Sequence, residues 1–283
     1  MRDGKGNTTW TFGGWQLPEH LAPHRCHPAG PLRHTYRFKE LIYFGAHYYH
    51  LLPDAGGRPG RFGQDSRIQA MPARPTTRFC LIRHGETDWN TEKRVQGQID
   101  IDLNAVGVAQ ARALQPSLSG HSFAAAYSSD LMRAWRTAQI ATVGMGFAVS
   151  PEPTLRERHF GVLQGVTSQE ARVQYPDVFR HHHARTPDYD YENGESLIVF
   201  SVRVTAGLEA LAARHGGQSV LAFTHGGVLD IVYRAATGRT LEAPRDFTLP
   251  NAAFNWLEHG PDGWRLISWA DCGHLHRALD EVL

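Results

Sequence analysis

Cysteine is scarce in this sequence of 283 residues, which contains only Cys26, Cys80 and Cys272, far apart from one another. An odd number of cysteines at such separations predicts neither a disulfide framework nor a zinc site. We therefore expect the protein to work in a reducing compartment, the cytoplasm.

Long apolar runs and a strong net charge are also lacking. The longest apolar stretch, residues 41–52, contains two histidines and is shorter than the roughly 20 residues of a membrane helix. The N-terminus has no apolar signal-peptide core. A formal charge of +1 creates no strong field for nucleic acid or an anionic membrane, although a local basic patch can bind a small anion. We therefore expect neither nucleic acid nor a membrane as a partner.

Residues 1–76 lack a sustained helical or strand period and are rich in Gly, Pro, Arg and His, as in "HLAPHRCHPAGPLRH" (20–34). Such a segment buries little apolar surface, so we predict a disordered N-terminal extension. Met71 stands shortly before the first clear strand, and a second hypothesis makes it the natural start of translation.

From residue 77 the sequence alternates between short apolar runs and amphipathic segments. Asn104 is the predicted N-cap of one helix, and Ser129 and Asp130 are the predicted cap of the next. This alternation predicts a three-layer α/β/α sandwich with a mostly parallel mixed sheet. The expected strands are 78–83, 123–128 and 219–224, the helices 104–118, 129–143, a part of 195–217 and 228–238, and a terminal hairpin joins 252–259 to 264–270.

Basic residues follow three of these strands. Arg83 and His84 end the first, Arg133 lies in the first turn after the second, and His225 precedes a Gly pair after the third. Ligands of such sheets bind beyond the carboxyl ends of the strands, where helix N-termini and Arg side chains attract phosphate. Each residue taken singly has an ordinary surface or structural explanation. Their recurrence at three junctions predicts a site for a phosphoryl group.

Four segments carry a resemblance to a known family. "LIRHGETDWN" (81–90), "SSDLMRAWRTA" (128–138), "LRERHFGVLQG" (155–165) and "FTHGG" (223–227) stand in the order of the motifs of the histidine phosphatase superfamily. The sequence therefore resembles the phosphoglycerate mutase-like proteins over about residues 77–283. This resemblance implies the phosphoglycerate mutase-like α/β sandwich for that catalytic domain.

The resemblance also implies a mechanism. His84 would attack phosphorus and form a phosphohistidine, because neutral imidazole has the lone pair that the attack requires. Arg83, Arg133 and His225 would hold the phosphoryl oxygens and offset their charge, and Asn90 matches a further phosphate-contacting position. These groups supply positive charge without a metal ion, so we expect neither a metal nor another cofactor.

Glu157 matches the acid that protonates the leaving oxygen and later helps water to attack the phosphohistidine. Glu86 is the other carboxylate near the first motif, and its position favours a structural role. Arg158 and His159 flank Glu157 and either touch the substrate or bond within their loop.

Other prominent residues have structural explanations. The three histidines of "FRHHHAR" (179–185) cannot all face one ion from a regular helix, so we interpret them as a solvated rim near the pocket. Glu195 and Ser196 fit a helix N-terminus, and the tryptophans of the terminal hairpin fit packing. They are Trp256, Trp264 and Trp269.

The substrate is a small phosphorylated metabolite on this interpretation, but the acceptor of its phosphoryl group stays open. Ser168 stands where glycolytic mutases have a Lys, and Arg180 and Arg185 are separated where those enzymes have paired arginines. The fourth motif continues as "HGGVLD" (225–230) in place of Asn, Ser, Leu and Arg. These differences favour a phosphatase over a 2,3-bisphosphoglycerate-dependent mutase, while an inactive phosphoester-binding protein is a third alternative. Family members are often dimers, which leaves a homodimer open.

Overall fold

The computed structural model describes residues 11–12, 15–16 and 75–275, and chain contacts divide it into two units, Met1–Ile68 and Gln69–Leu283. In the first unit, β1 (Thr11–Phe12) pairs antiparallel with β2 (Trp15–Gln16). The prediction of a disordered segment over 1–76 falls almost wholly outside the described residues.

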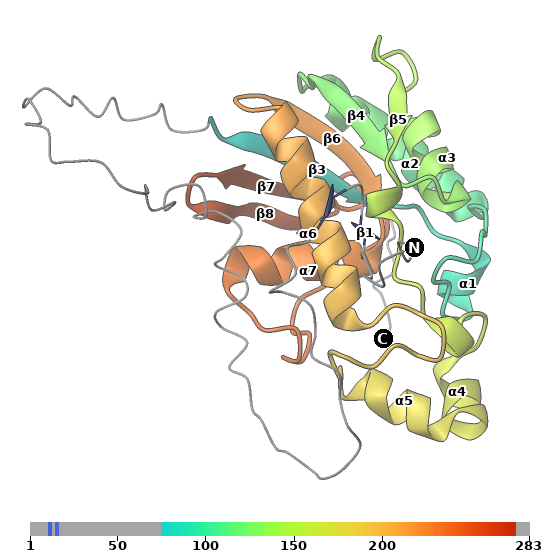
Figure 1. The fold of residues 1–283 in the computed structure, drawn as a ribbon. Coiled ribbons are helices and arrows are strands. Elements are labelled where there is room, and N and C mark those ends of the chain that lie inside the picture. Colours follow the sequence, from blue (N-terminus) through green and yellow to red (C-terminus); the bar gives the residue numbers. More distant parts are fainter. Residues whose placement is uncertain (1–10, 13–14, 17–74, 276–283) are drawn as a thin grey trace, which may run out of the picture. The chain divides into compact units, whose positions relative to one another are not determined.

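The second unit contains a six-stranded mixed sheet with the order β5-β4-β6-β3-β7-β8 (Figure 1). The neighbours from β5 to β3 are parallel, whereas β7 pairs antiparallel with β3 and with β8. This topology confirms the mostly parallel sheet and the terminal hairpin. The strands are β3 (Thr77–Arg83), β4 (Ala125–Ser128), β5 (Val149–Pro151), β6 (Ser219–Thr224), β7 (Phe254–Gly260) and β8 (Gly263–Asp271).

Seven helices accompany this sheet in the described part of the chain, none of them long and apolar enough to cross a membrane. Short 3₁₀ turns, η2 (Pro153–Leu155) and η3 (Gly161–Leu163), follow β5. The helices are α1 (Asp88–Thr91), α2 (Ala105–Ser119), α3 (Met132–Ala141), α4 (Ser168–Gln174), α5 (Pro176–His183), α6 (Leu197–Arg214) and α7 (Gly226–Thr237).

The central strand β3 separates two hydrophobic cores. Phe79 and Leu81 pack with residues of α6 and α7, whereas Cys80 and Ile82 pack with residues of α2 and α3. Successive side chains of a strand point to opposite faces, so β3 is buried on both sides. Figure 1 shows α6 across one face of the sheet and α2 and α3 at the other. The predicted three-layer α/β/α sandwich is thereby confirmed.

One face of α6 carries an apolar stripe at helical spacing, and this stripe is buried. Ser196 caps this helix, because its side chain accepts a hydrogen bond from the Val199 N–H at 3.1 Å. The stripe consists of Phe200, Val204, Leu208 and Leu211.

The predicted cap of α3 was wrong. This helix begins at Met132 and not at Ser129, and its N-cap residue Leu131 makes no side-chain bond. The Met132 N–H donates instead to Asp100 Oδ1 at 2.6 Å. An acceptor 32 residues earlier in the chain therefore satisfies this helix end.

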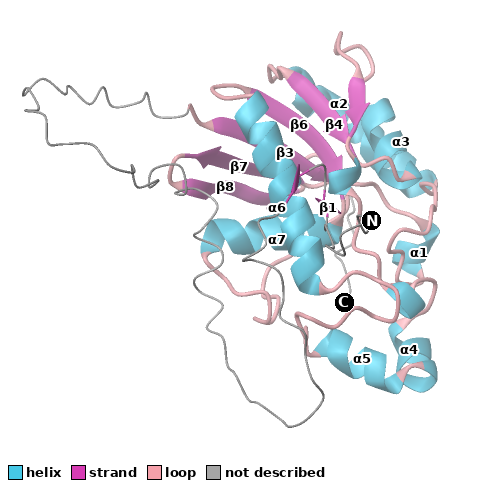
Figure 2. Ribbon diagram, viewed as in Figure 1, coloured by secondary structure: helices cyan, strands magenta, loops and turns pink. Residues whose placement is uncertain are grey.

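Helices α4 and α5 form a small group beside α1, away from the sheet (Figure 2). Neither helix was predicted from the sequence. Thr167 and Glu170 form a capping box at the start of α4, and Pro176 occupies the first position of α5. A third hydrophobic cluster, which includes Phe160 and Val178, packs under these helices.

Candidate active site

The carboxyl ends of β3 and β6 lie side by side, since these strands are parallel and Arg83 pairs with Thr224 in their register. His84 and His225 directly follow these two residues. Five of the six predicted site residues line one cavity, which we call the central cavity, and the sixth, His225, lies beside it. The five are Arg83, His84, Asn90, Arg133 and Glu157.

His84 is 3% exposed, and a contact with the backbone of the next residue orients its ring. Its Nδ1 lies 2.7 Å from the Gly85 carbonyl oxygen. A carbonyl only accepts hydrogen bonds, so Nδ1 carries the hydrogen and Nε2 keeps a free lone pair. The neutral ring thus has an available nucleophilic nitrogen.

Both site histidines are held in the neutral form. Desolvation by burial, followed by the charges of Arg133 and Arg83, lowers the pKa of His84 well below its usual value, against the opposing bond to Gly85. Burial and the Arg133 charge likewise lower the pKa of His225. The two rings lie 5.2 Å apart between centroids, and His225 Nε2 bonds to Ser129 Oγ at 2.8 Å.

Two guanidinium groups bring positive charge to the same place. Arg83 and Arg133 are 2% and 1% exposed. Arg83 donates to the Leu249 carbonyl, and Arg133 donates to the carbonyls of Ile99 and Gly97. These carbonyls orient both guanidinium groups, whose positive charge can attract an anion.

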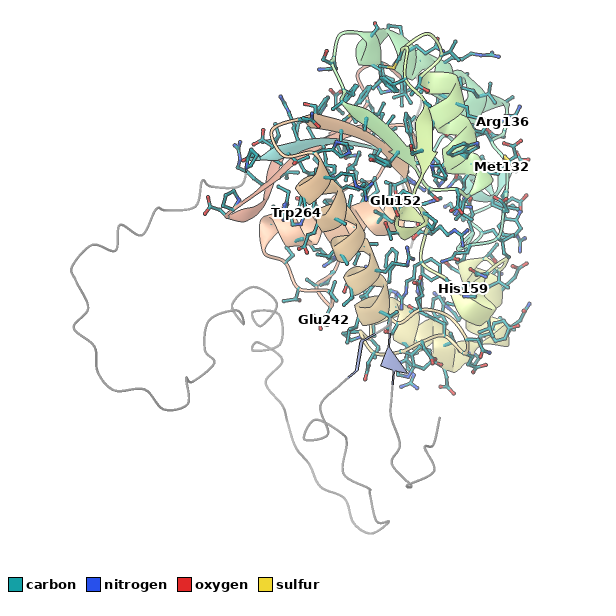
Figure 3. The ribbon with its side chains drawn as sticks, turned by 45° about the horizontal axis from the view of Figure 1, so that its top comes forward. Met132, Arg136, Glu152, His159, Glu242 and Trp264 are labelled. Carbon is teal, nitrogen blue, oxygen red and sulfur yellow. The ribbon has the colours of Figure 1, made fainter. Side chains whose placement is uncertain are left out.

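Arg133 is buried because of its position on α3. Figure 3 labels Met132 and Arg136, one turn apart, on the outer side of this helix. Met132 is 42% exposed and Arg136 pairs with Asp102 at 2.6 Å. Arg133 belongs to the buried side with Ala134 and is directed into the protein.

Asn90 is held in α1 by the capping box with Thr87. Asn90 Oδ1 accepts the Thr87 N–H and hydroxyl, both at 3.0 Å. These bonds fix the amide, so its Nδ2 is the donor that Asn90 can offer to a ligand in the central cavity.

Glu157 is 5% exposed and joins the loop before η3 to the start of α7. Its Oε1 accepts the Arg158 N–H at 2.6 Å and its Oε2 accepts the Gly227 N–H at 2.9 Å. Two backbone donors therefore fix a carboxyl group at the wall of the central cavity, where it can exchange a proton with a bound ester.

The central cavity has a volume of about 50 Å³, and its remaining charged lining is also basic. Lys93 and Arg94 belong to it, and Arg94 pairs with Glu170 at 2.8 Å. Within the described residues, no three or more His, Cys, Asp or Glu side chains are arranged as a metal site. The cavity is suited to a small anion.

Glu86 does not line this cavity. Its Oε1 accepts from Asn104 Nδ2 at 3.0 Å, and its backbone N–H donates to Gln110. Asn104 itself caps α2 through the Gly107 N–H at 2.9 Å. Glu86 therefore connects the first motif to the start of α2, in agreement with the structural interpretation of this residue.

A second cavity of about 280 Å³, which we call the side cavity, adjoins the central one because Phe160 and His182 line both. Arg158 and Arg185 also line it, whereas Arg180 is exposed and pairs with Asp177. Of the two residues that follow Glu157, Arg158 lines the side cavity. His159 bonds to Glu195 through its N–H and accepts from the Gly161 N–H.

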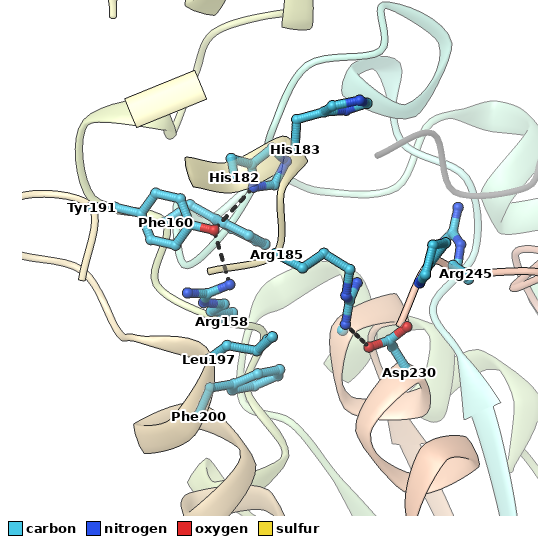
Figure 4. Close-up of a pocket in the computed structure, with 12 residues that line it drawn as sticks. Arg158, Phe160, His182, His183, Arg185, Tyr191, Leu197, Phe200, Asp230 and Arg245 are labelled. Atoms are coloured by element: carbon cyan, nitrogen blue, oxygen red, sulfur yellow. Dashed lines mark hydrogen bonds and ion pairs between the residues drawn. The ribbon is translucent and has the colours of Figure 1, made fainter. Parts of the chain in front are cut away.

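The interpretation of residues 179–185 as a solvated rim was wrong for His182. His181 stacks on Tyr189 and His183 on Phe179, but His182 is part-buried and lines both cavities. Arg158, Tyr191 and Asp230, which were not among the predicted site residues, also line the side cavity (Figure 4). Pro176, at the first position of α5, was the sequence signal for the helix that carries His182.

Comparison with known proteins identifies the family of this chain. The model of the histidine phosphatase superfamily (branch 1) matches residues 79–272. The chain belongs to this superfamily. The match includes all four motifs and every residue of the candidate active site.

The names of similar proteins in this superfamily refer both to phosphatases and to phosphoglycerate mutase-like proteins. A metal-independent phosphoserine phosphatase of Arabidopsis thaliana is 36% identical over 77% of this chain and 90% of its own length. Phosphoglycerate mutase-like protein 4 of the same plant is 34% identical over 70% and 86%. The structure of Bacillus stearothermophilus YhfR is 30% identical, with a TM-score of 0.64 over 70% of this chain and 98% of that one.

Proposed function

We propose that the protein is a phosphomonoester hydrolase that acts on a small phosphorylated metabolite through a phosphohistidine at His84. The bond from His84 Nδ1 to the Gly85 carbonyl is the observation that carries this proposal, because it leaves Nε2 as the free nucleophile beside Arg83 and Arg133. We assign the activity to residues 77–283 and the remaining 1–76 to a non-catalytic extension.

In the first step, His84 Nε2 attacks phosphorus while the bond from phosphorus to the ester oxygen breaks. The bonding electrons leave with that oxygen, which takes the proton of the Glu157 carboxyl group. Arg83 and Arg133 offset the charge on the three phosphoryl oxygens, and the neutral ring of His225 and the amide of Asn90 donate hydrogen bonds to them.

In the second step, water attacks the phosphohistidine and gives its proton to the Glu157 carboxylate. The bond from nitrogen to phosphorus breaks, His84 regains its lone pair and inorganic phosphate leaves. The proton gained by Glu157 restores the starting state. The bonds from Arg158 N–H and Gly227 N–H to Glu157 support this double role, because they hold the carboxyl group in place through both steps.

A phosphoglycerate mutase activity is the second candidate, and the composition of the side cavity favours it. Arg158, Arg185 and Arg245 line this cavity and suit the carboxylate of a bound sugar acid. Such an acid could accept the phosphoryl group from His84 in place of water.

Rapid quench with a radiolabelled phosphoester tests both candidates. The wild-type protein should form an acid-labile phosphoenzyme and His84→Ala should form none. A panel of phosphate esters, assayed for released phosphate and for isomerised product, then separates hydrolase from mutase. Absence of labelled protein with every ester would reject both in favour of an inactive binding protein.

A further inference from the structure

His182 lies where the central cavity meets the side cavity. The central cavity contains His84 and the two buried arginines, and the side cavity extends from the same place past Arg158 to Arg245. Among the residues that the structure describes, His182 and Phe160 line both cavities. An ester whose phosphoryl group occupies the central cavity and whose remainder occupies the side cavity must therefore pass these two side chains.

The Tyr191 hydroxyl determines which nitrogen of His182 carries the hydrogen. Arg158 Nη1 donates to this hydroxyl at 3.0 Å, and His182 Nδ1 lies 3.1 Å from it (Figure 4). A guanidinium group only donates, so the hydroxyl accepts from Arg158. Among the described residues, His182 Nδ1 is the acceptor within reach of the hydroxyl hydrogen, so we infer that the hydroxyl donates to it. The hydrogen of the neutral ring then resides on Nε2.

The surroundings keep His182 neutral. Desolvation, together with the charges of Arg158 and Arg185, lowers the pKa of His182 to about 4. Near neutral pH its ring is therefore a hydrogen-bond donor without a net charge. It differs in this respect from Arg158 and Arg185 on the same cavity.

The backbone from Tyr191 to Asn193 is strained and is held in place by its contacts. Tyr191, Glu192 and Asn193 have φ values of 60°, 53° and 76°, in the left-handed region. Such residues each cost on the order of 1–3 kcal/mol and persist where their surroundings impose them. A Cβ on Gly161 would meet the Tyr191 carbonyl oxygen at 2.0 Å, and the Val162 N–H donates to that oxygen at 3.2 Å.

The contacts of His181 explain its position, whereas packing alone does not explain the hydrogen bond between His182 and Tyr191. His181 bonds to Thr186 and stacks on Tyr189. His182 instead meets Phe160 at an edge, with 5.7 Å between ring centroids, and within the described residues its hydrogen bond is made through Nδ1. Because His182 lies where the central cavity meets the side cavity, a ligand there can reach Nε2 on the other side of its ring.

We propose that His182 is a substrate-binding residue that donates its Nε2–H to an oxygen of the leaving group, and that Tyr191 is its positioning residue. The preferred substrates are then phosphomonoesters whose leaving group carries a hydroxyl or carboxylate oxygen close to the ester. This inference rests on the proposed hydrolase or mutase function, because it takes the side cavity as the place of the leaving group.

Two substitutions at His182 separate a donor from a packing residue. The amide nitrogen of His182→Gln can reach the position of Nε2, whereas that of His182→Asn can reach only the position of Nδ1. Glycerol 3-phosphate and propyl phosphate serve as matched substrates, because they differ in the two hydroxyl groups. His121→Gln serves as the control variant, because His121 is exposed and its ring lies tilted against Trp256, with 4.8 Å between centroids.

His182→Asn should lower kcat/KM for glycerol 3-phosphate about 5- to 10-fold more than for propyl phosphate, mainly through KM, as one neutral hydrogen bond would. His182→Gln should restore most of this loss. Equal losses for both esters, equal behaviour of Asn and Gln, or no loss at all would each overturn the proposal.

The role of Tyr191 has a spectroscopic readout. Nitrogen NMR of the imidazole groups should show His182 with its hydrogen on Nε2 in the wild type, and a mixture of tautomers in Tyr191→Phe. A wild-type ring with its hydrogen on Nδ1 would contradict the inference.

Failure of this inference can be distinguished from failure of the proposed function. Calorimetric binding of glycerol 3-phosphate to His84→Ala measures the same contact without turnover. Adding His182→Asn to that variant should weaken binding about 5- to 10-fold, and adding His182→Gln should weaken it little. An unchanged affinity rejects the His182 contact, whereas a missing phosphoenzyme in the wild type rejects only the chemistry.

Discussion

Gly227 and Glu157 approach each other so closely that a side chain at position 227 would displace the Glu157 carboxyl group. The Gly227 N–H donates to Glu157 Oε2 at 2.9 Å, and a Cβ on Gly227 would meet Glu157 Oε1 at 2.1 Å. The second glycine of "FTHGG" therefore leaves space for the carboxyl group that we propose as the general acid. The first turn of α7 thus helps to hold Glu157 as well as the phosphoryl site.

Gly227→Ala should therefore displace Glu157 while the chain still folds. We expect kcat for an alkyl phosphate to fall by about 10²-fold or more, as for loss of a general acid. Circular dichroism should remain that of the wild type. Gly120→Ala is the matched control, because the nearest atom to its new Cβ is Ser117 O at 3.6 Å. A fully active Gly227→Ala protein would show that Glu157 is not needed where it lies.

Much of the sheet and its site could be predicted because they follow from local rules. The short apolar runs between amphipathic segments predicted the strands, and the carboxyl ends of parallel strands lie at the same edge of a sheet. Arg83, His84 and His225 could thus be brought together without a structure. Arg133 followed from its place in the first turn of α3.

Other features depend on contacts between distant segments. Asp100 caps α3 from 32 residues away, and Tyr191 reaches His182 through a left-handed turn that no glycine signals. The helix that carries His182 is short, and its sequence lacks a long apolar stripe. The capping box at Thr167 and Glu170 was a readable signal for its neighbour α4.

Removal of metal ions tests the source of positive charge in the central cavity. EDTA should leave turnover almost unchanged, because Arg83 and Arg133 supply the charge that a divalent cation supplies in other phosphoryl-transfer enzymes. Initial rates before and after dialysis against the chelator provide the measurement. A loss of activity that one specific divalent ion restores would contradict the proposed mechanism.

Asp230 should contribute strongly to stability. Its Oδ2 pairs with Arg185 at 2.6 Å and with Arg234 at 2.9 Å, and Arg234 is 1% exposed. Asp230→Asn leaves these cations without their carboxylate, so the free energy of unfolding should fall by about 3–5 kcal/mol. Urea unfolding measures this change. Asp177→Asn breaks the exposed pair with Arg180 and should have little effect, so equal midpoints for the two variants would refute the prediction.

Acid should destabilise the protein through its neutral histidines. Their pKa is lowered in the folded state, well below normal for His84 and His225 and to about 4 for His182. Below pH 6.5 the unfolded chain binds protons that the folded protein does not, so the free energy of unfolding should fall as the pH falls from about 6.5 toward 4. His182→Gln should make this decline less steep in urea titrations at several pH values. A wild-type stability that is constant between pH 6.5 and 5 would contradict these pKa directions.

The last prediction separates the nucleophile from the acid. His84→Ala removes the atom that bonds to phosphorus, so turnover should nearly vanish with every ester. Glu157→Gln keeps the shape of the side chain but removes its proton, so its effect should depend on the leaving group. An alkyl phosphate leaves as a basic alkoxide and should react about 10²–10⁴-fold more slowly. p-Nitrophenyl phosphate leaves as a stabilised phenolate and should be slowed much less.

The measurement must follow phosphohistidine formation alone, because Glu157 should also assist water in the second step. Single-turnover quench with both esters isolates the first step. If Glu157→Gln slows both esters equally in that step, Glu157 is not the proton donor. Glu86 does not line the central cavity and accepts a hydrogen bond from Asn104, so it is poorly placed to replace Glu157. A bound water or the substrate itself would then be the source of the proton.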